Sequence, residues 1–165
     1  MNWFMLLIKL LHILGGIMMI AGLVGRGITR IEAAKAKDIH EFNMLIQLGG
    51  RFENQLVIPG SILVFLFGLI SAWLRGWPIL GFLQGAASNW LLASTLLYLT
   101  MVPLIIFIFI PRGKWFGAAL QTALTQGKIT EELWERFEDR VVHLAHQVEI
   151  IVVAAILYLM VMKPF

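Results

Sequence analysis

Four long apolar segments alternate with stretches rich in charged residues along this chain. Each segment approaches the roughly 20 residues that a helix needs to cross the hydrocarbon core of a bilayer. The predicted spans cover residues 3–24, 56–74, 90–110 and 141–162. The pattern therefore predicts an all-α polytopic membrane protein, in which residues 1–165 form a single domain built as a four-transmembrane-helix bundle.

Charged residues in the two segments that join spans one and two, and spans three and four, predict the orientation. Ten of the 13 basic residues lie there: Arg26, Arg30, Lys35, Lys37, Arg51, Arg112, Lys114, Lys128, Arg136 and Arg140. Only Lys9, Arg75 and Lys163 lie on the other side. Because basic residues accumulate in cytoplasmic loops, both joining segments are expected in the cytoplasm and both termini outside.

The two joining segments are also expected to be helical. Residues 31–47 read as a helix of mixed charge that extends span one or leads into span two. Residues 115–124 repeat apolar positions at helical spacing before Gly127, which predicts a short helix on the cytoplasmic surface. Thr130 is a predicted N-cap, so the fourth helix is expected to begin there, before its apolar run.

The composition excludes several kinds of partner and several kinds of chemical site. The chain is 59% hydrophobic and 14% charged, whereas soluble domains carry about 25% charged residues. It has no cysteine, which excludes disulfides, thiolate metal sites and covalent haem attachment. The basic residues flank apolar spans, so the expected partner is the lipid bilayer and not nucleic acid. Without a hydrolase motif, whether the protein is an enzyme stays open.

His12 is an ionisable residue inside the first apolar span. Gly15 and Gly16 follow it by three and four residues and share its face of a helix. One interpretation is helix packing, with His12 hydrogen-bonded to a neighbouring helix. The other is a haem b site, in which His12 ligates iron and the glycines leave room for the macrocycle.

The fourth span begins with a polar stripe formed by His143, His146 and Glu149. Glu149 lies well inside the apolar run and needs a partner, for which His146 and His12 are the candidates. These three stripe residues, together with His12, are also candidate metal ligands. At the start of span two, Glu53 is expected to pair with a nearby arginine.

Depth in the membrane limits how one haem could be ligated. From the helical rise, His12 lies roughly 13 Å and His146 roughly 24 Å below the outer ends of their spans. Met101 in span three lies close to the depth of His12. The second axial ligand is therefore Met101 or His146, or the iron is five-coordinate.

Several segments resemble a known family. They are Ile8-Lys-Leu-Leu-His12-Ile-Leu-Gly15-Gly16, Leu56-Val-Ile-Pro59, Trp90-Leu-Leu-Ala-Ser94 and Leu157-Tyr-Leu-Met-Val-Met-Lys163-Pro164. Nearly the whole chain is similar to the DUF2269 family of small bacterial integral membrane proteins, which implies a bacterial cytoplasmic (inner) membrane location. More distantly, the first span resembles HemJ-type protoporphyrinogen oxidases and CopD-like copper proteins. HemJ-type proteins imply a haem-ligating histidine at His12, but the lysine ligand of their third span has no counterpart here.

Three hypotheses follow for the function. The first is a b-type haem-binding membrane protein with a redox or haem-handling role. The second is a metal-ion or small-solute transport or sensing protein that uses the polar stripe of span four. The third is a non-catalytic accessory subunit of a membrane complex. A homo-oligomer or a larger membrane complex is an expected assembly for each of them.

Overall fold

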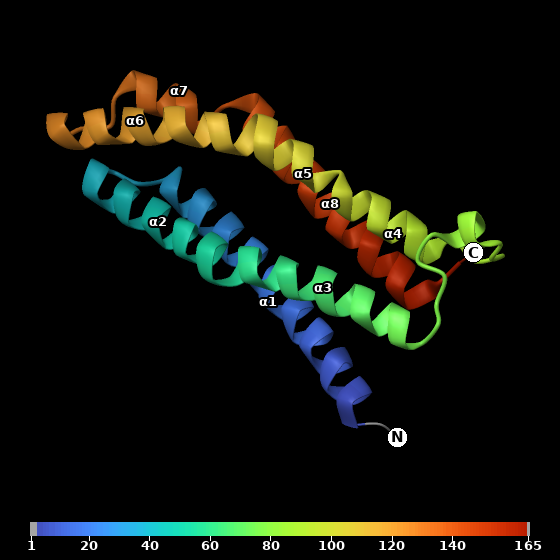
Figure 1. Ribbon diagram of the computed structural model, residues 1–165. Coiled ribbons are helices and arrows are strands. Elements are labelled where there is room, and N and C mark those ends of the chain that lie inside the picture. Colours follow the sequence, from blue (N-terminus) through green and yellow to red (C-terminus); the bar gives the residue numbers. More distant parts are fainter. Residues whose placement is uncertain (1–2, 165) are drawn as a thin grey trace. The chain divides into compact units, whose positions relative to one another are not determined.

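The computed structural model describes residues 3–164, and within them it contains helices and turns but no strand (Figure 1). Four helical rods are long and apolar enough to cross a membrane: Trp3–Ala33, Ile39–Leu74, Trp90–Gln126 and Glu131–Met162. Each predicted span lies within one of these rods. The all-α fold with four transmembrane helices is therefore confirmed.

The chain divides into two compact units, Met1–Trp77 and Pro78–Phe165, which are described separately. The first unit consists of α1 (Trp3–Ala33), α2 (Ile39–Phe52), the π-helical turn η1 (Glu53–Val57) and α3 (Ile58–Leu74). The second begins with the 3₁₀ turn η2 (Gly81–Gln84), α4 (Trp90–Leu99), α5 (Met101–Leu104) and the π-helical turn η3 (Ile105–Phe109). It continues with α6 (Ile110–Gln126), α7 (Glu131–Phe137) and α8 (Arg140–Met162).

A stripe of mostly small residues holds the first unit together. Every seventh residue of α1 is buried, namely Ile8, Gly15, Gly22 and Thr29. This stripe packs along α2, η1 and α3, which run beside α1 in Figure 1. A repeat of seven keeps one face of a helix against its partner, as in a left-handed helix pair. Small residues let the two backbones approach closely without a hydrophobic driving force.

In the second unit, α4 and η3 pack against α8, and α6 packs against α7. Buried residues of α8 again recur every seven positions, at Ala145, Val152 and Leu159. At one end of the hairpin the Lys163 ammonium lies 5.2 Å from the centre of the Trp90 ring. The α4 and α8 helices are therefore antiparallel neighbours.

Prolines account for the two π-helical turns. Pro59 and Pro111 each lie in the first turn of the helix that follows a π turn. Proline has no N–H to donate, and its ring crowds the carbonyl four residues earlier. Those carbonyls belong to Gln55 and Phe107, which lie inside η1 and η3 respectively. The widened turns accommodate this crowding while both rods stay helical.

The helix predicted over residues 31–47 is interrupted in the structure. α1 extends the first span to Ala33, and α2 begins at Ile39 and leads into the second span. Asp38 ends the intervening turn because its carboxylate accepts hydrogen bonds from the N–H groups of His40 and Glu41, at 2.8 and 2.9 Å. A good N-cap at this position starts a new helix where the pattern alone suggested a continuous one.

Residues 115–124 are helical as predicted, but they belong to α6, which continues the rod of the third span. Pro111 does not stop this rod because a proline is tolerated in the first turn of a helix. Gly127 ends α6 with φ 67°, and Thr130 caps α7 through the Leu133 N–H, so both predicted boundaries are confirmed. The fourth rod is then interrupted before α8, which Asp139 caps.

Apolar side chains face outward along all four rods. Ile17 in α1 is 59% exposed, and Ile151 in α8 is 66% exposed. Continuous apolar surface of this kind is unfavourable in water but suits contact with lipid tails. The protein is therefore expected to contact the lipid bilayer along these faces.

Candidate functional site

His12 is held between the two helices of the first unit. Its Nδ1 lies 2.9 Å from the carbonyl oxygen of Val64 in α3. A carbonyl can only accept, so the imidazole carries its proton on Nδ1 and donates it to Val64. This tautomer leaves Nε2 with a lone pair. Within residues 3–164, Nε2 has no hydrogen-bond partner, and the side chain is half-buried.

Gly68 provides the space for the His12 ring. A Cβ atom placed on Gly68 would lie 3.0 Å from Cε1 and 3.1 Å from Nδ1 of His12. The ring therefore packs directly on the α3 backbone, one helical turn after Val64. This contact between the imidazole and Gly68 was not anticipated from the sequence, although a glycine in the apolar run 56–74 was a signal of close approach.

Gly15 and Gly16 have different surroundings. A Cβ on Gly15 would lie 2.7 Å from Leu63 Cβ and 2.9 Å from the carbonyl oxygen of Gly60. The face of Gly15 is thus filled by α3, which is the helix-packing interpretation. A Cβ on Gly16 would meet only Val64 Cγ2, at an ordinary contact distance of 3.8 Å. Helix packing accordingly requires a glycine at position 15 but not at position 16.

Glu149 is paired with His146 one turn earlier in α8. His146 Nδ1 lies 3.2 Å from Glu149 Oε2, and the two side chains are 24% and 14% exposed. Of the two partners expected for Glu149, the structure therefore gives His146. Phe109, the last residue of η3, stacks on the His146 ring with centroids 4.7 Å apart and planes inclined by 22°. This aromatic cover was not predicted from the sequence.

His143 stands apart from that pair. It is exposed, and its Nε2 lies 3.1 Å from Nε2 of Gln147. Across residues 3–164, no group of three or more histidine, aspartate or glutamate side chains is placed to hold a metal ion. The structure therefore does not support a metal centre built from His143, His146, Glu149 and His12.

Met101 is the first residue of α5 and is half-buried. It belongs to the same unit as His146, whereas His12, Gly15 and Gly16 belong to the other unit. Within the first unit the structure brings His12 near its glycines, and within the second unit it pairs His146 with Glu149.

An arginine–carboxylate bridge joins the two helical arms of each unit. Arg26 bonds Glu53 in the first unit, so the ion pair expected for Glu53 is confirmed. Arg112 bonds Asp139 in the second unit, and the residues of both bridges are 27 positions apart. Sequence reasoning missed the second bridge, although Asp139 immediately precedes the apolar run that α8 carries.

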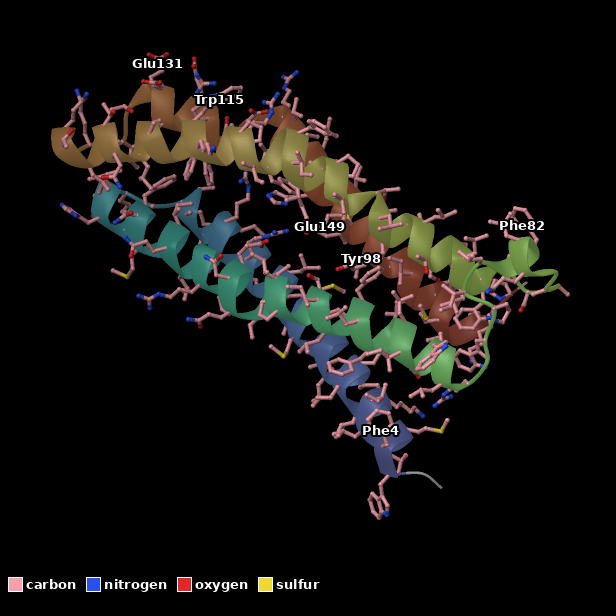
Figure 2. All side chains as sticks on the ribbon, in the orientation of Figure 1. Phe4, Phe82, Tyr98, Trp115, Glu131 and Glu149 are labelled. Atoms are coloured by element: carbon pink, nitrogen blue, oxygen red, sulfur yellow. The ribbon has the colours of Figure 1, made fainter. Side chains whose placement is uncertain are left out.

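Trp115 lies in a cluster of basic and aromatic side chains at the α6–α7 end of the second unit. The guanidinium carbons of Arg112 and Arg136 lie 6.0 and 5.6 Å from the centre of its ring. Figure 2 shows Trp115 and Glu131 at this end. An exposed tryptophan beside cationic groups is typical of a membrane–water interface.

Four apolar helical rods with outward-facing apolar residues define an integral membrane protein. The chain belongs to the family described as "Predicted integral membrane protein (DUF2269)", whose family model matches residues 6–164. The resemblance stated from the sequence is therefore confirmed for this family, whereas the more distant likeness to HemJ-type and CopD-like proteins is not shown. No curated protein and no solved structure matches the chain significantly.

Proposed function

We propose that this integral membrane protein binds haem b, with His12 as an axial ligand through Nε2, and has a redox or haem-handling role. The observation that carries the proposal is the hydrogen bond from His12 Nδ1 to the Val64 carbonyl. Ligating histidines commonly donate their other ring N–H to a backbone carbonyl, which fixes the tautomer and makes the ligating nitrogen more basic. The imidazole of His12 is already in the tautomer that an Nε2 ligand needs.

Gly16 supports the proposal from the same helix. It lies one turn from His12, so its lack of a side chain leaves the surface next to the imidazole flat. Helix packing does not use this feature, since a Cβ would fit at position 16. A flat macrocycle beside His12 would use it. Gly15 has no such role because α3 already fills its face.

The proposal names His12 as the one axial ligand, because the two other candidates, Met101 and His146, belong to the second unit. One axial histidine can hold haem iron in a five-coordinate state. When bound, the haem would supply one-electron chemistry, while the chain supplies the His12 ligand, its orientation and an apolar surrounding.

The proposal includes a location and an orientation. The protein would lie in a bacterial cytoplasmic membrane, with the turn between α1 and α2 and the turn between α6 and α7 on the cytoplasmic side. The basic residues around these turns support this sidedness through the positive-inside rule. Both chain termini would then face outward.

An absorption spectrum tests the proposal. Purified protein supplied with haem should show a Soret band that changes on reduction, and His12→Ala should lose most of it. His40→Ala is the matched control, because His40 is an exposed histidine in the same unit. If wild-type protein binds no haem, or if both variants retain the same Soret band, His12 is not a haem ligand. A Gly16→Phe variant should weaken binding while His12 stays in place.

A further inference from the structure

Arg112, Trp115 and Arg136 form a cluster of basic and aromatic side chains where α6 meets α7 in the second unit. We propose that these three residues, the Trp115 cluster, bind the phosphate group of an anionic phospholipid of the membrane. Guanidinium groups bind phosphate oxygens through charge-assisted hydrogen bonds, and tryptophan is enriched at membrane–water interfaces. The proposal does not depend on haem, because no residue of the cluster takes part in the proposed haem site.

The Trp115 cluster lies at the depth of lipid headgroups. The apolar run of the third rod ends at Ile110, and Arg112 and Trp115 follow it in the same rod. With a rise of about 1.5 Å per residue, these two residues lie about 3 Å and about 8 Å beyond the end of the run. The headgroup layer extends roughly 5–8 Å beyond the hydrocarbon core on each side of a bilayer. Both side chains can therefore reach the phosphate groups of surrounding lipids.

Packing between α6 and α7 holds the cluster in place. The buried residues of these two helices are Ala119, Leu120, Ala123, Leu133 and Phe137. The ring centres of Phe116 in α6 and Phe137 in α7 lie 6.4 Å apart. Trp115 precedes the first of these rings and Arg136 precedes the second, so the contact limits how far the two residues can separate. A preformed arrangement of this kind lowers the entropic cost of binding a ligand.

The bridge to Asp139 orients the Arg112 side chain. The Arg112 guanidinium bonds the Asp139 carboxylate, and its carbon atom lies 6.0 Å from the centre of the Trp115 ring. A guanidinium has five N–H donors, so one carboxylate does not use all of them. Asp139 nevertheless offsets the charge of Arg112. The positive charge that attracts a phosphate must therefore come mainly from Arg136.

Arg136 is exposed, and its guanidinium carbon lies 5.6 Å from the centre of the Trp115 ring. Within residues 3–164 no carboxylate lies within ion-pair distance of this guanidinium. Its planar fork of N–H donors can bind two phosphate oxygens at once. Trp115 is 52% exposed and carries an indole N–H, which can donate to a further lipid oxygen.

Acidic side chains around Arg136 favour a direct contact over a diffuse attraction to the membrane. Four exposed glutamates lie in or next to α7: Glu131, Glu132, Glu135 and Glu138. Figure 2 shows Glu131 at the same end of the unit as Trp115. These carboxylates repel an anionic bilayer surface, so net charge alone gives little attraction here. Lipid binding should therefore depend on the individual residues of the Trp115 cluster.

Native mass spectrometry of the full chain, in detergent micelles with added lipid, tests the site. Wild-type protein should retain one dioleoylphosphatidylglycerol and bind it more tightly than dioleoylphosphatidylcholine, which has no net charge. Arg136→Gln should lower the affinity for phosphatidylglycerol about tenfold, because it removes a charge-assisted contact. Lys128→Gln is the matched control, since Lys128 is an exposed basic residue in the turn between α6 and α7. It should leave the affinity nearly unchanged.

An equal loss of affinity in Arg136→Gln and Lys128→Gln would mean attraction by net charge and would overturn the site. Equal affinity of wild-type protein for the two lipids would also overturn it. Inorganic phosphate at the concentration of the lipid tests the source of the phosphate group. It should not displace phosphatidylglycerol, because it lacks the acyl chains that hold the lipid beside the protein. Displacement would assign the cluster to a soluble anion and contradict a lipid site.

A second variant separates charge from folding. Arg136→Lys keeps the positive charge and should retain more affinity than Arg136→Gln, while circular dichroism checks that both variants stay helical. If the lysine and glutamine variants bind phosphatidylglycerol equally well, the charge at position 136 does not hold the lipid. None of these results affects the haem proposal, which the Soret band of His12→Ala tests separately.

Discussion

Gly15 and Gly16 are adjacent in α1, yet the structure gives them opposite tolerance to a side chain. At position 15 a Cβ would lie within 2.9 Å of α3 atoms that include the backbone nitrogen of Val64. Backbone cannot swing aside, so the two helices would have to separate. At position 16 the nearest atom is the end of the Val64 side chain.

Substitution of each glycine by alanine is the first prediction. Gly15→Ala should lower the free energy of unfolding by about 1–3 kcal/mol, the usual cost of overpacking. Gly16→Ala should be neutral or raise it by up to about 1 kcal/mol, because alanine favours a helix over glycine. Denaturation in mixed micelles, followed by circular dichroism, measures both values. Equal stability of the two variants would contradict the close contact between α1 and α3.

His12 illustrates what a residue pattern can and cannot show. The apolar run identified it as an unusual residue, and the neighbouring glycines indicated close approach. The sequence left helix packing and ligand binding open. The structure shows that Gly15 serves packing, whereas the hydrogen bond to Val64 and the space at Gly68 depend on the register of two helices far apart in sequence. The residue pattern of α1 or of α3 alone does not determine how the two helices are aligned.

At the scale of the element, the start of α2 depends on one carboxylate. The backbone N–H groups of Glu41 and His40 stabilise the charged form of Asp38 and lower its pKa below the usual value. The charged form of Asp38 is therefore the stronger cap, and ionisation adds to the stability of the helix start. Its contribution is fully present above the unfolded-state pKa of about 3.9 and is lost as pH falls through the lower folded-state pKa.

The second prediction follows from the lowered pKa of Asp38. As pH falls below about 4, the first turn of α2 should fray, and the amide of Glu41 should lose protection against hydrogen exchange. Asp38→Asn keeps a side-chain oxygen that can cap the helix but does not titrate in this range. In this variant, hydrogen exchange of the Glu41 amide should lack the part of its pH dependence that comes from titration of Asp38. Identical pH profiles for the two proteins would exclude Asp38 as the source.

Helical elements were more predictable than their interruptions. Hydropathy located each of the four spans, because an apolar run of this length is stable mainly inside a bilayer. The break before Asp38 and the π turns before Pro59 and Pro111 were missed. The sequence signals of these interruptions are a capping residue, Asp38, and the two prolines. Whether a proline kinks a helix, widens one turn or only begins a helix depends on the packing around it.

At the scale of the molecule, an arginine–carboxylate bridge links the two helical arms of each unit, and its two residues are 27 positions apart in both units. The interiors of the two units nevertheless differ. In the first, Gly15 and Gly60 bring α1 and α3 backbones into contact. In the second, the Phe109 ring of η3 stacks on the His146 ring of α8, so that aromatic side chains connect the two arms. Similar bridges thus connect arms that pack in different ways.

Sidedness gives the third prediction. Because the chain has no cysteine, single cysteines can report accessibility without background. In intact cells, Lys37→Cys should react with a membrane-impermeant maleimide only after permeabilisation. Gln84→Cys, in the turn between the second and third rods, should react before it. The opposite result would place the termini in the cytoplasm and contradict the orientation derived from the basic residues.

The stripe of α1 has a consequence for how this protein can change over time. Where Ile8, Gly15, Gly22 and Thr29 meet the neighbouring helices, there is little room for larger side chains. The intervening outward positions contact lipid tails, which adapt to almost any apolar shape. The number of substitutions tolerated at each position of α1 should therefore vary with a period of seven residues. Neutral substitutions would accumulate on the lipid-facing surface of α1, while the buried stripe between the helices would stay unchanged.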